Sequence, residues 1–176
     1  RSAEEGNTYF KGQPVNHQYS KSWRFEQSYQ KYLSCFLAPQ IRYFSLLRPL
    51  YEIQIIHEFA KYPSYFSLFR SCNREERVDR WCGSCPKCLF TLLSLAPFVE
   101  GAAIHEIFGH DLLEDETLKD LLRALLGIGD AVKPFECVGT FEEVRALVAA
   151  VIERCSSAGE KKKKLLRTVP NEVLAQ

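Results

Sequence analysis

The stretch Ser71-Cys-Asn-Arg-Glu-Glu-Arg-Val-Asp-Arg-Trp-Cys-Gly-Ser-Cys-Pro-Lys-Cys-Leu-Phe90 holds four of the seven cysteines of this 176-residue chain. Nine residues separate Cys72 from Cys82, and two residues separate each later pair up to Cys88. A two-residue gap lets neighbouring thiolates turn toward one ion, and Gly83 suits the tight turn because it adopts a positive φ without steric cost. Four soft thiolates favour zinc or an iron–sulfur centre over magnesium or calcium.

The metal of this cluster has three interpretations. The ligand set Cys72, Cys82, Cys85 and Cys88 predicts a structural zinc site, which is the interpretation we prefer. Iron–sulfur ligation is an alternative because Cys-x2-Cys-x2-Cys also occurs in ferredoxins, although their run closes downstream with Cys-Pro. Plain buried or redox-active cysteines are the third interpretation.

The composition is that of a globular chain with one core, since 46% of the residues are hydrophobic and 26% are charged. The net charge of +1 gives no electrostatic reason to expect nucleic acid or an acidic membrane as a partner. We find no apolar run long enough to cross a bilayer and no signal peptide. An odd number of cysteines, seven, of which four are clustered with metal-ligand spacing, indicates a reduced, cytoplasmic compartment. Because the sequence begins with Arg1 and contains no methionine, we expect a fragment of a longer protein.

The apolar pattern predicts an α/β region that ends near Pro97. Ile41 to Leu47 has the composition of a buried strand, and Arg48-Pro49 is expected to open a helix that stops at Pro63. A strand, a short turn and a helix form half of a βαβ unit, in which ligands lie at the carboxyl ends of strands. Arg48 is therefore expected at such an end and is a candidate for substrate binding.

Beyond the cysteines the pattern becomes helical. Pro86 to Ala96 is expected to form a largely buried helix, and Thr140-Phe-Glu-Glu143 is a capping box that opens another. We also expect a helix from Ser20 or Ser22 to about Phe36, with its aromatic side chains in the core. The predicted units are a distal α/β domain with the zinc site, a helical region, and a linker with a solvated basic tail, which occupy residues 1–97, 98–157 and 158–176.

Several polar side chains outside the cysteine cluster are candidates for binding or catalysis. Cys137 and Glu136 lie in a loop that leads into a helix amino terminus, where a thiol can be reactive; the alternative is a small buried residue that fixes the loop. His17 precedes a helix start and is either a hydrogen-bonded structural histidine or a ligand of phosphate or carboxylate. Asn16 and Lys21 belong to the same polar segment and are candidates for substrate binding.

Five strings carry a family resemblance. They are Asn16-His-Gln-Tyr-Ser-Lys-Ser22, Phe44-Ser-Leu-Leu-Arg-Pro49, Phe69-Arg-Ser-Cys-Asn-Arg74, Trp81-Cys-Gly-Ser-Cys-Pro-Lys-Cys-Leu-Phe90 and Lys133-Pro-Phe-Glu-Cys-Val-Gly139. Together they resemble the bacterial UDP-N-acetylmuramoyl-L-alanyl-L-glutamate epimerases over the chain as far as about residue 155. The cysteine motif alone is similar to the wider superfamily of PP-loop ATP pyrophosphatases, such as the queuosine-precursor synthases.

The resemblance implies an enzyme that uses ATP and magnesium to invert the terminal L-glutamate of a UDP-muramoyl dipeptide to D-glutamate in peptidoglycan precursor synthesis. It also implies the distal half of a Rossmann-like PP-loop domain with a structural zinc. Adenylation of a carboxylate would acidify the α-proton, and inversion then needs a base and an acid on opposite sides of the α-carbon. By residue chemistry, Cys137, Glu136 and His17 are the candidates for these two roles.

The chain departs from the PP-loop pattern in one respect. PP-loop enzymes cradle the ATP phosphates with a Ser-Gly-Gly-x-Asp-Ser-type loop, and no such string occurs in this sequence. The resemblance places that loop upstream of Arg1, so we expect this chain alone not to hydrolyse ATP. Two other functions stay open: a PP-loop enzyme that modifies a nucleobase or tRNA, and a zinc-stabilised binding module without catalysis.

Overall fold

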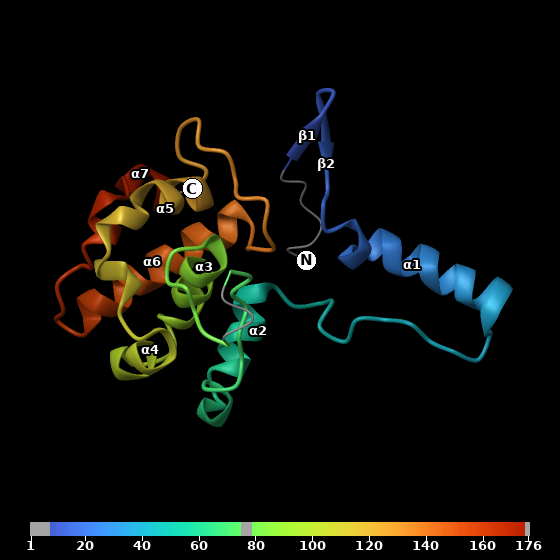
Figure 1. Ribbon diagram of the computed structural model, residues 1–176, viewed down its shortest axis with the longest axis horizontal. Coiled ribbons are helices and arrows are strands. Elements are labelled where there is room, and N and C mark those ends of the chain that lie inside the picture. Colours follow the sequence, from blue (N-terminus) through green and yellow to red (C-terminus); the bar gives the residue numbers. More distant parts are fainter. Residues whose placement is uncertain (1–7, 75–78, 175–176) are drawn as a thin grey trace.

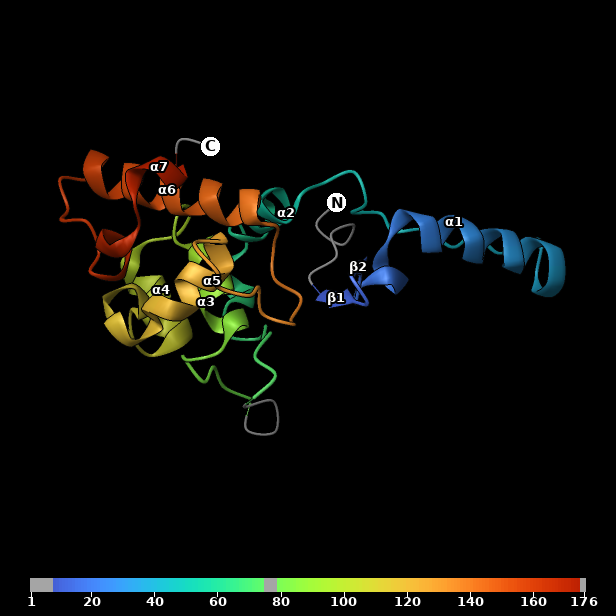
Figure 2. The ribbon, with the colours of Figure 1, turned by 90° about the horizontal axis from the view of Figure 1, so that it is seen from above.

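The computed structural model describes residues 8–74 and 79–174, which form a helical body with an arm that projects from it (Figures 1 and 2). The arm, residues 8–47, carries β1 (Thr8–Phe10), β2 (Gln13–Val15) and α1 (Trp23–Tyr32). The body contains α2 (Glu52–Phe59), α3 (Pro86–Leu95), α4 (Gly101–Phe108), α5 (Lys119–Leu126), α6 (Phe141–Ser157) and α7 (Asn171–Leu174). Short 3-10 turns lie at Tyr19–Lys21, Pro63–Tyr65, Leu112–Glu114, Glu116–Leu118 and Leu165–Thr168, and a π-helical turn at Leu33–Leu37 continues α1.

Helix α3 is the centre of the body. Nine of its ten residues are buried, and it packs against α2, α5 and α6. The helix starts within the cysteine stretch, because Cys85 is its N-cap and Pro86 occupies the first turn, where its missing N–H costs no hydrogen bond. The predicted buried helix after the cysteines is therefore confirmed.

Helix ends in the body follow the predicted local chemistry. The capping box of α6 is present, since Glu143 N–H donates to Thr140 Oγ1 at 3.1 Å and Thr140 N–H donates to Glu143 Oε2 at 2.8 Å. Helices α4 and α5 are each followed by a glycine C-cap, Gly109 and Gly127, whose φ angles of 79° and 67° lie in the left-handed region.

The strand predicted at Ile41–Leu47 is wrong. This segment is irregular and exposed, and among residues 8–74 and 79–174 the only sheet is the antiparallel pair β1–β2. A strand needs a neighbour to accept its backbone hydrogen bonds, and here α1 side chains do so instead. Gln30 Oε1 accepts from Tyr43 N–H, and Glu26 Oε2 accepts from Ser45 N–H at 2.9 Å. A Rossmann-like sheet is therefore not part of the described chain, which has little strand and is largely helical.

Two further expectations about the arm are wrong. Ser22 does cap α1, but the aromatic side chains of the helix are not core, since Phe36 is 75% exposed. The buried side chain of α1 is Glu26, whose Oε2 lies 2.7 Å from Arg48 Nη2. Arg48 also does not follow a strand or open a helix, because α2 begins three residues after Pro49, at Glu52.

The C-terminal tail is also different from the expectation. Leu165 and Leu166 are fully buried, and Lys163 Nζ lies 3.2 Å from Asp111 Oδ2. The tail is thus part of the core rather than a solvated end, and one hydrophobic cluster runs from Phe66 to Val169. The predicted division into three units is not tested by this packing and stays a prediction. Within the described part of the chain, no helix combines the length and apolar character that a bilayer crossing requires.

Candidate functional site

A cavity of about 220 Å³ lies where the arm meets the body. Its lining comes from the turn before α1, the segment before α2, the first turns of α2 and the loop before α6. The lining residues are Gln18, Lys21, Ser45, Leu47, Arg48, Leu50, Glu52, Ile55, Cys137 and Val138. Three residues that the sequence singled out, Lys21, Arg48 and Cys137, therefore meet at one place.

One contact in the lining of this cavity joins Lys21 and Cys137. Lys21 Nζ lies 3.3 Å from Cys137 Sγ, although the two residues are 116 positions apart. Lys21 belongs to the 3-10 turn before α1, and Cys137 to the loop that leads to the cap Thr140 of α6. A sulfur in contact with a cation, at the edge of a cavity, has the surroundings that acid–base or nucleophilic thiols use.

His17 lies beside the same loop. Its ring packs against Phe135, with the ring centroids 4.5 Å apart. Both ring nitrogens are buried, and neither has a hydrogen-bond partner among the residues that the structure describes. Burial is the main cause that lowers the pKa of His17, and the charges of Lys21 and Lys133 lower it further. A neutral imidazole can donate one hydrogen bond through one ring nitrogen and accept one through the other.

The other predicted site residues differ in the hydrogen bonds that they make within the protein. Glu136 Oε2 is buried and, among the described residues, makes no hydrogen bond. Asn16 Oδ1 accepts from Gln18 N–H at 2.8 Å, which fixes the local turn. Arg48 donates from Nη1 to the carbonyl of Lys21 and pairs through Nη2 with Glu26. Arg48 therefore shapes the cavity wall by tying the arm together.

Sequence reasoning missed Glu52, which lines the cavity from the first turn of α2. Burial raises the pKa of the Glu52 carboxyl, the nearby charge of Glu143 raises it further, and Lys21 acts in the opposite direction. In a sequence, an acidic residue in a first helical turn reads only as a favourable partner of the helix dipole. The tertiary contact with Glu143, 91 positions away, has no local signal.

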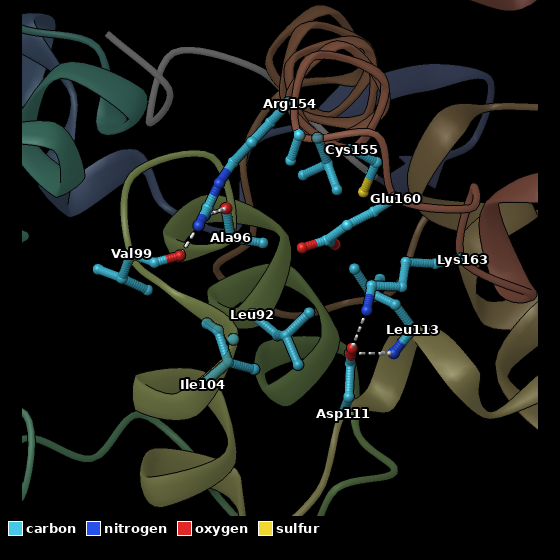
Figure 3. A pocket seen from close by; sticks show the side chains of 13 residues that line it. Leu92, Ala96, Val99, Ile104, Asp111, Leu113, Arg154, Cys155, Glu160 and Lys163 are labelled. Carbon is cyan, nitrogen blue, oxygen red and sulfur yellow. Dashed lines mark hydrogen bonds and ion pairs between the residues drawn. The ribbon is translucent and has the colours of Figure 1, made fainter.

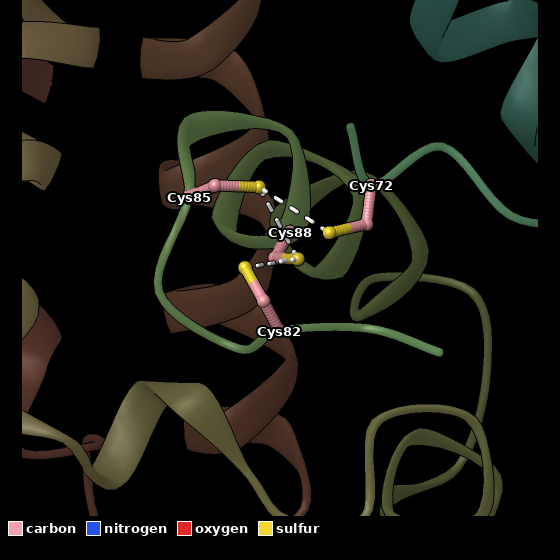
Figure 4. Close-up of side chains that lie close together, drawn as sticks. All are labelled: Cys72, Cys82, Cys85 and Cys88. Atoms are coloured by element: carbon pink, nitrogen blue, oxygen red, sulfur yellow. Dashed lines mark hydrogen bonds between the residues drawn. The ribbon is translucent and has the colours of Figure 1, made fainter. Parts of the chain in front are cut away.

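The four cysteines form a compact cluster at the start of α3 (Figure 4). The Sγ–Sγ distances are 3.4 Å for Cys85–Cys88, 3.7 Å for Cys82–Cys88 and 3.9 Å for Cys85–Cys72. All four sulfurs lie within 4.8 Å of one another, so they could hold a metal ion. The contact with Cys88 lowers the pKa of Cys85 to about 6 and raises that of Cys88, as expected when adjacent thiols share one charge.

A second cavity, of about 160 Å³, is lined by residues of α3, α4 and α6 and of the segment that follows α6 (Figure 3). Three of its charged side chains are engaged within the protein. Arg154 donates to the carbonyls of Ala96 and Val99, and Lys163 pairs with Asp111. These bonds tie α6 to the end of α3 and the tail to the segment after α4.

Comparison with known proteins matches both parts of the chain. Residues 1–46 match the family model of the MurL N-terminal domain, and residues 68–175 match that of the MurL C-terminal domain. No solved structure matches the chain.

Three curated relatives carry the name UDP-N-acetyl-alpha-D-muramoyl-L-alanyl-L-glutamate epimerase. The protein of Xanthomonas oryzae pv. oryzae is 45% identical over 160 residues, which cover 88% of this chain and 35% of the relative. The protein of a Micromonospora species is 40% identical, with 90% and 40% covered, and that of Salinispora tropica is 42% identical, with 81% and 32% covered. The chain thus spans about a third to two fifths of the length of these relatives.

Proposed function

This chain belongs to the MurL epimerase family, and from that premise we propose that it is part of an enzyme of peptidoglycan precursor synthesis. The reaction is the inversion of the terminal L-glutamate of UDP-N-acetylmuramoyl-L-alanyl-L-glutamate to D-glutamate. The observation that carries the proposal is the identity of 40% to 45% with two epimerases over 88% to 90% of the chain. The same observation favours epimerisation over a nucleobase-modifying enzyme or a non-catalytic zinc module.

The cavity between arm and body is the proposed active site. Inversion removes the α-proton of glutamate from one face and returns a proton to the other, which needs an acid and a base. Cys137, in contact with Lys21, is the proposed group on one face. His17 and Glu136 remain candidates for proton transfer because each keeps a buried polar atom without a described partner.

Substrate binding is proposed for the cationic rim of the cavity. The terminal glutamate carries carboxylates, and Lys21 and Arg48 supply positive charge to the same cavity. Asn16 would contribute through the turn that it stabilises next to His17. Arg48 can serve only with the donor capacity that its bonds to Glu26 and to the Lys21 carbonyl leave.

We propose that the metal of the cysteine cluster is zinc. Four Zn–S bonds of about 2.3 Å in a tetrahedron place the sulfurs about 3.8 Å apart. The shortest Sγ–Sγ distances, 3.4 to 3.9 Å, fit this geometry, and a spread within 4.8 Å suits one ion better than a cluster of irons and sulfides. A closed four-thiolate site leaves no open coordination position, so its proposed role is to fix the start of α3.

We further propose that the enzyme uses ATP and magnesium, contains a PP-loop domain and works in the cytoplasm. The 176 residues contain no Ser-Gly-Gly-x-Asp-Ser-type string, so they lack the loop that would bind the ATP phosphates. We therefore assign no step at this cavity to ATP. We assign the phosphate loop and a Rossmann-like sheet to the additional length that the relatives have. The exposed apolar side chains of the arm, such as Phe36 and Leu46, would pack against that part.

A chirality assay tests the proposed function. The protein that contains this chain at its natural length is incubated with UDP-N-acetylmuramoyl-L-alanyl-L-glutamate, ATP and magnesium, and the glutamate is then released by hydrolysis. Separation of the enantiomers should show D-glutamate that forms in proportion to enzyme concentration. A matched reaction without ATP separates the nucleotide requirement from the inversion. Only L-glutamate at every enzyme concentration, in a folded protein, would contradict the proposal.

A further inference from the structure

We infer that Glu52 is the second acid–base group of the epimerisation and that it works with Cys137 in the cavity between arm and body. The inference rests on the proposed function and extends it to a residue that the sequence did not indicate. Glu52 and Cys137 line one cavity of about 220 Å³, and they reach it from separate elements, α2 and the loop before α6. Two proton-transfer groups on separate elements can contact a bound α-carbon from different sides, as inversion requires.

The backbone of Glu52 is fixed by Glu143. Glu143 Oε1 accepts from Glu52 N–H at 2.9 Å, and its Oε2 accepts from Thr140 N–H at 2.8 Å. One buried carboxylate thus joins the amino termini of α2 and α6, both of which carry partial positive charge. Because each Glu143 oxygen accepts a backbone hydrogen bond, Glu143 is a positioning residue rather than the acid itself.

The side-chain carboxyl group of Glu52 is available to bind another molecule. Within residues 8–74 and 79–174 it makes no hydrogen bond and no ion pair, and only its backbone N–H is engaged. It is half-buried at the cavity wall, where a bound molecule would complete its hydrogen bonding.

Glu52 and Cys137 have different electrostatic surroundings, as an acid and a base in one active site require. Burial and the charge of Glu143 raise the pKa of Glu52, and the charge of Lys21 acts in the opposite direction. Cys137 Sγ, in contrast, contacts the Lys21 ammonium group at 3.3 Å. Different surroundings for two groups in one cavity are how acid and base roles are divided at a common pH.

In the proposed reaction, the Cys137 thiolate removes the α-proton and forms an S–H bond. The electron pair of the broken C–H bond stays on the α-carbon and delocalises into the adjacent carbonyl. The Glu52 O–H bond breaks, and its proton forms the new C–H bond on the opposite face. Cys137 then loses a proton to water and Glu52 regains one, so the only net change is the configuration of glutamate.

Solvent deuterium tests this division of roles in the natural-length protein with its nucleotide substrate, ATP and magnesium. The L- and D-glutamyl epimers are supplied separately in D₂O, and deuterium at the α-carbon is read by mass spectrometry alongside epimerisation. Glu52→Gln and Cys137→Ala should each slow epimerisation by at least about 100-fold, the usual size of an acid–base contribution. Each variant should still exchange the α-proton of one epimer, and the two variants should retain opposite epimers.

Two controls keep a structural role apart from proton transfer. Glu58→Gln alters an exposed carboxylate on the same helix, paired with Lys61, and should stay within about twofold of the wild type. Glu52→Asp keeps the acid on a shorter side chain and should restore part of the exchange that Glu52→Gln loses. Loss of exchange from both epimers in Glu52→Gln, or epimerisation within about threefold of the wild type, would overturn the inference. An inactive wild type would instead overturn the proposed function.

Discussion

The arm and the body bury opposite kinds of side chain. In the body, α3 buries leucines on all sides, and one apolar cluster reaches from Phe66 to Val169. In the arm, α1 buries Glu26 while Tyr32 and Phe36 lie exposed. Both helices have apolar residues at helical spacing, so the pattern predicts a helix in each case. Whether those residues are buried depends on the elements that surround the helix, which the spacing does not reveal.

The two regions are also held by different forces. Burial of apolar area, roughly 25 cal/mol per Å², stabilises the body without regard to direction. The arm depends on directed contacts, in which Glu26 accepts from Ser45 N–H and pairs with Arg48. The proposed active site lies at the junction, where Lys21 of the arm contacts Cys137 of the body. Its geometry therefore depends on both kinds of contact.

The largest expected effect comes from removal of the metal cluster. Cys88→Ser should abolish stoichiometric zinc and destabilise or unfold the body, because a structural zinc contributes on the order of 10 kcal/mol of folding free energy. Metal analysis of the purified protein and its thermal unfolding measure both effects. Cys155→Ala changes a buried cysteine outside the cluster and should keep one zinc per chain. Full stability of a zinc-free Cys88→Ser protein would contradict the structural role.

Truncation of a core side chain in the body should lower the free energy of unfolding more than truncation of an apolar side chain in the arm. Leu122 is fully buried in α5, so Leu122→Ala should lower the free energy of unfolding by about 2 to 5 kcal/mol through lost burial and a cavity. Phe36→Ala removes a side chain that is 75% exposed and should change it by no more than about 0.5 kcal/mol in this 176-residue chain. Denaturant titration of both variants gives the comparison, and equal losses would show that the arm packs as the body does.

Glu26 should stabilise the arm alone. Glu26→Ala removes two hydrogen bonds to a charged carboxylate, from Arg48 and from the Ser45 N–H, which costs about 1 to 3 kcal/mol. Hydrogen exchange should therefore accelerate in residues 38–50 and stay unchanged in α3. Acceleration in both regions would mean that arm and body unfold together.

Acid should release the same contact without a mutation. The hydrogen bond from Arg48 holds the pKa of Glu26 below its usual value of 4.5, against a smaller opposing effect of burial. A carboxyl group whose pKa is lowered by folding stabilises above pH 4.5 and loses this contribution as pH falls through the lowered value. The two tryptophans allow a regional readout, because Trp23 lies in the arm and Trp81 in the body. Trp23 fluorescence in Trp81→Phe should change as the pH falls below 4.5, and Glu26→Ala should remove that change.

The confirmed predictions depend on interactions between residues that are close in the sequence. The capping box at Thr140, the proline start of α3 and the convergence of the four cysteines are all determined within a few turns of chain. The failures concern long-range partners. Ile41–Leu47 has the composition of a strand, but no described strand pairs with it. The basic tail packs on the body because Leu165 and Leu166 reach the core, while Lys161 and Lys164 stay exposed.

The candidate site shows the same division. Residue chemistry in the sequence made Cys137 and Lys21 candidates, and the fold brings them to 3.3 Å across 116 positions. Glu52 was missed because its acidity and its place in the cavity come from Glu143, which is distant in the sequence.

One measurement tests the central claim that the junction of arm and body is the site of chemistry. Epimerisation is compared for the wild type, Cys137→Ala and Cys35→Ala in the natural-length protein, with zinc content and melting temperature recorded for each. Cys35 is an exposed cysteine of the arm, so its variant controls for the loss of a thiol. We predict that Cys137→Ala loses at least about 100-fold in kcat/KM with zinc and melting temperature unchanged, while Cys35→Ala stays at the wild-type rate. Wild-type turnover by Cys137→Ala would contradict the account.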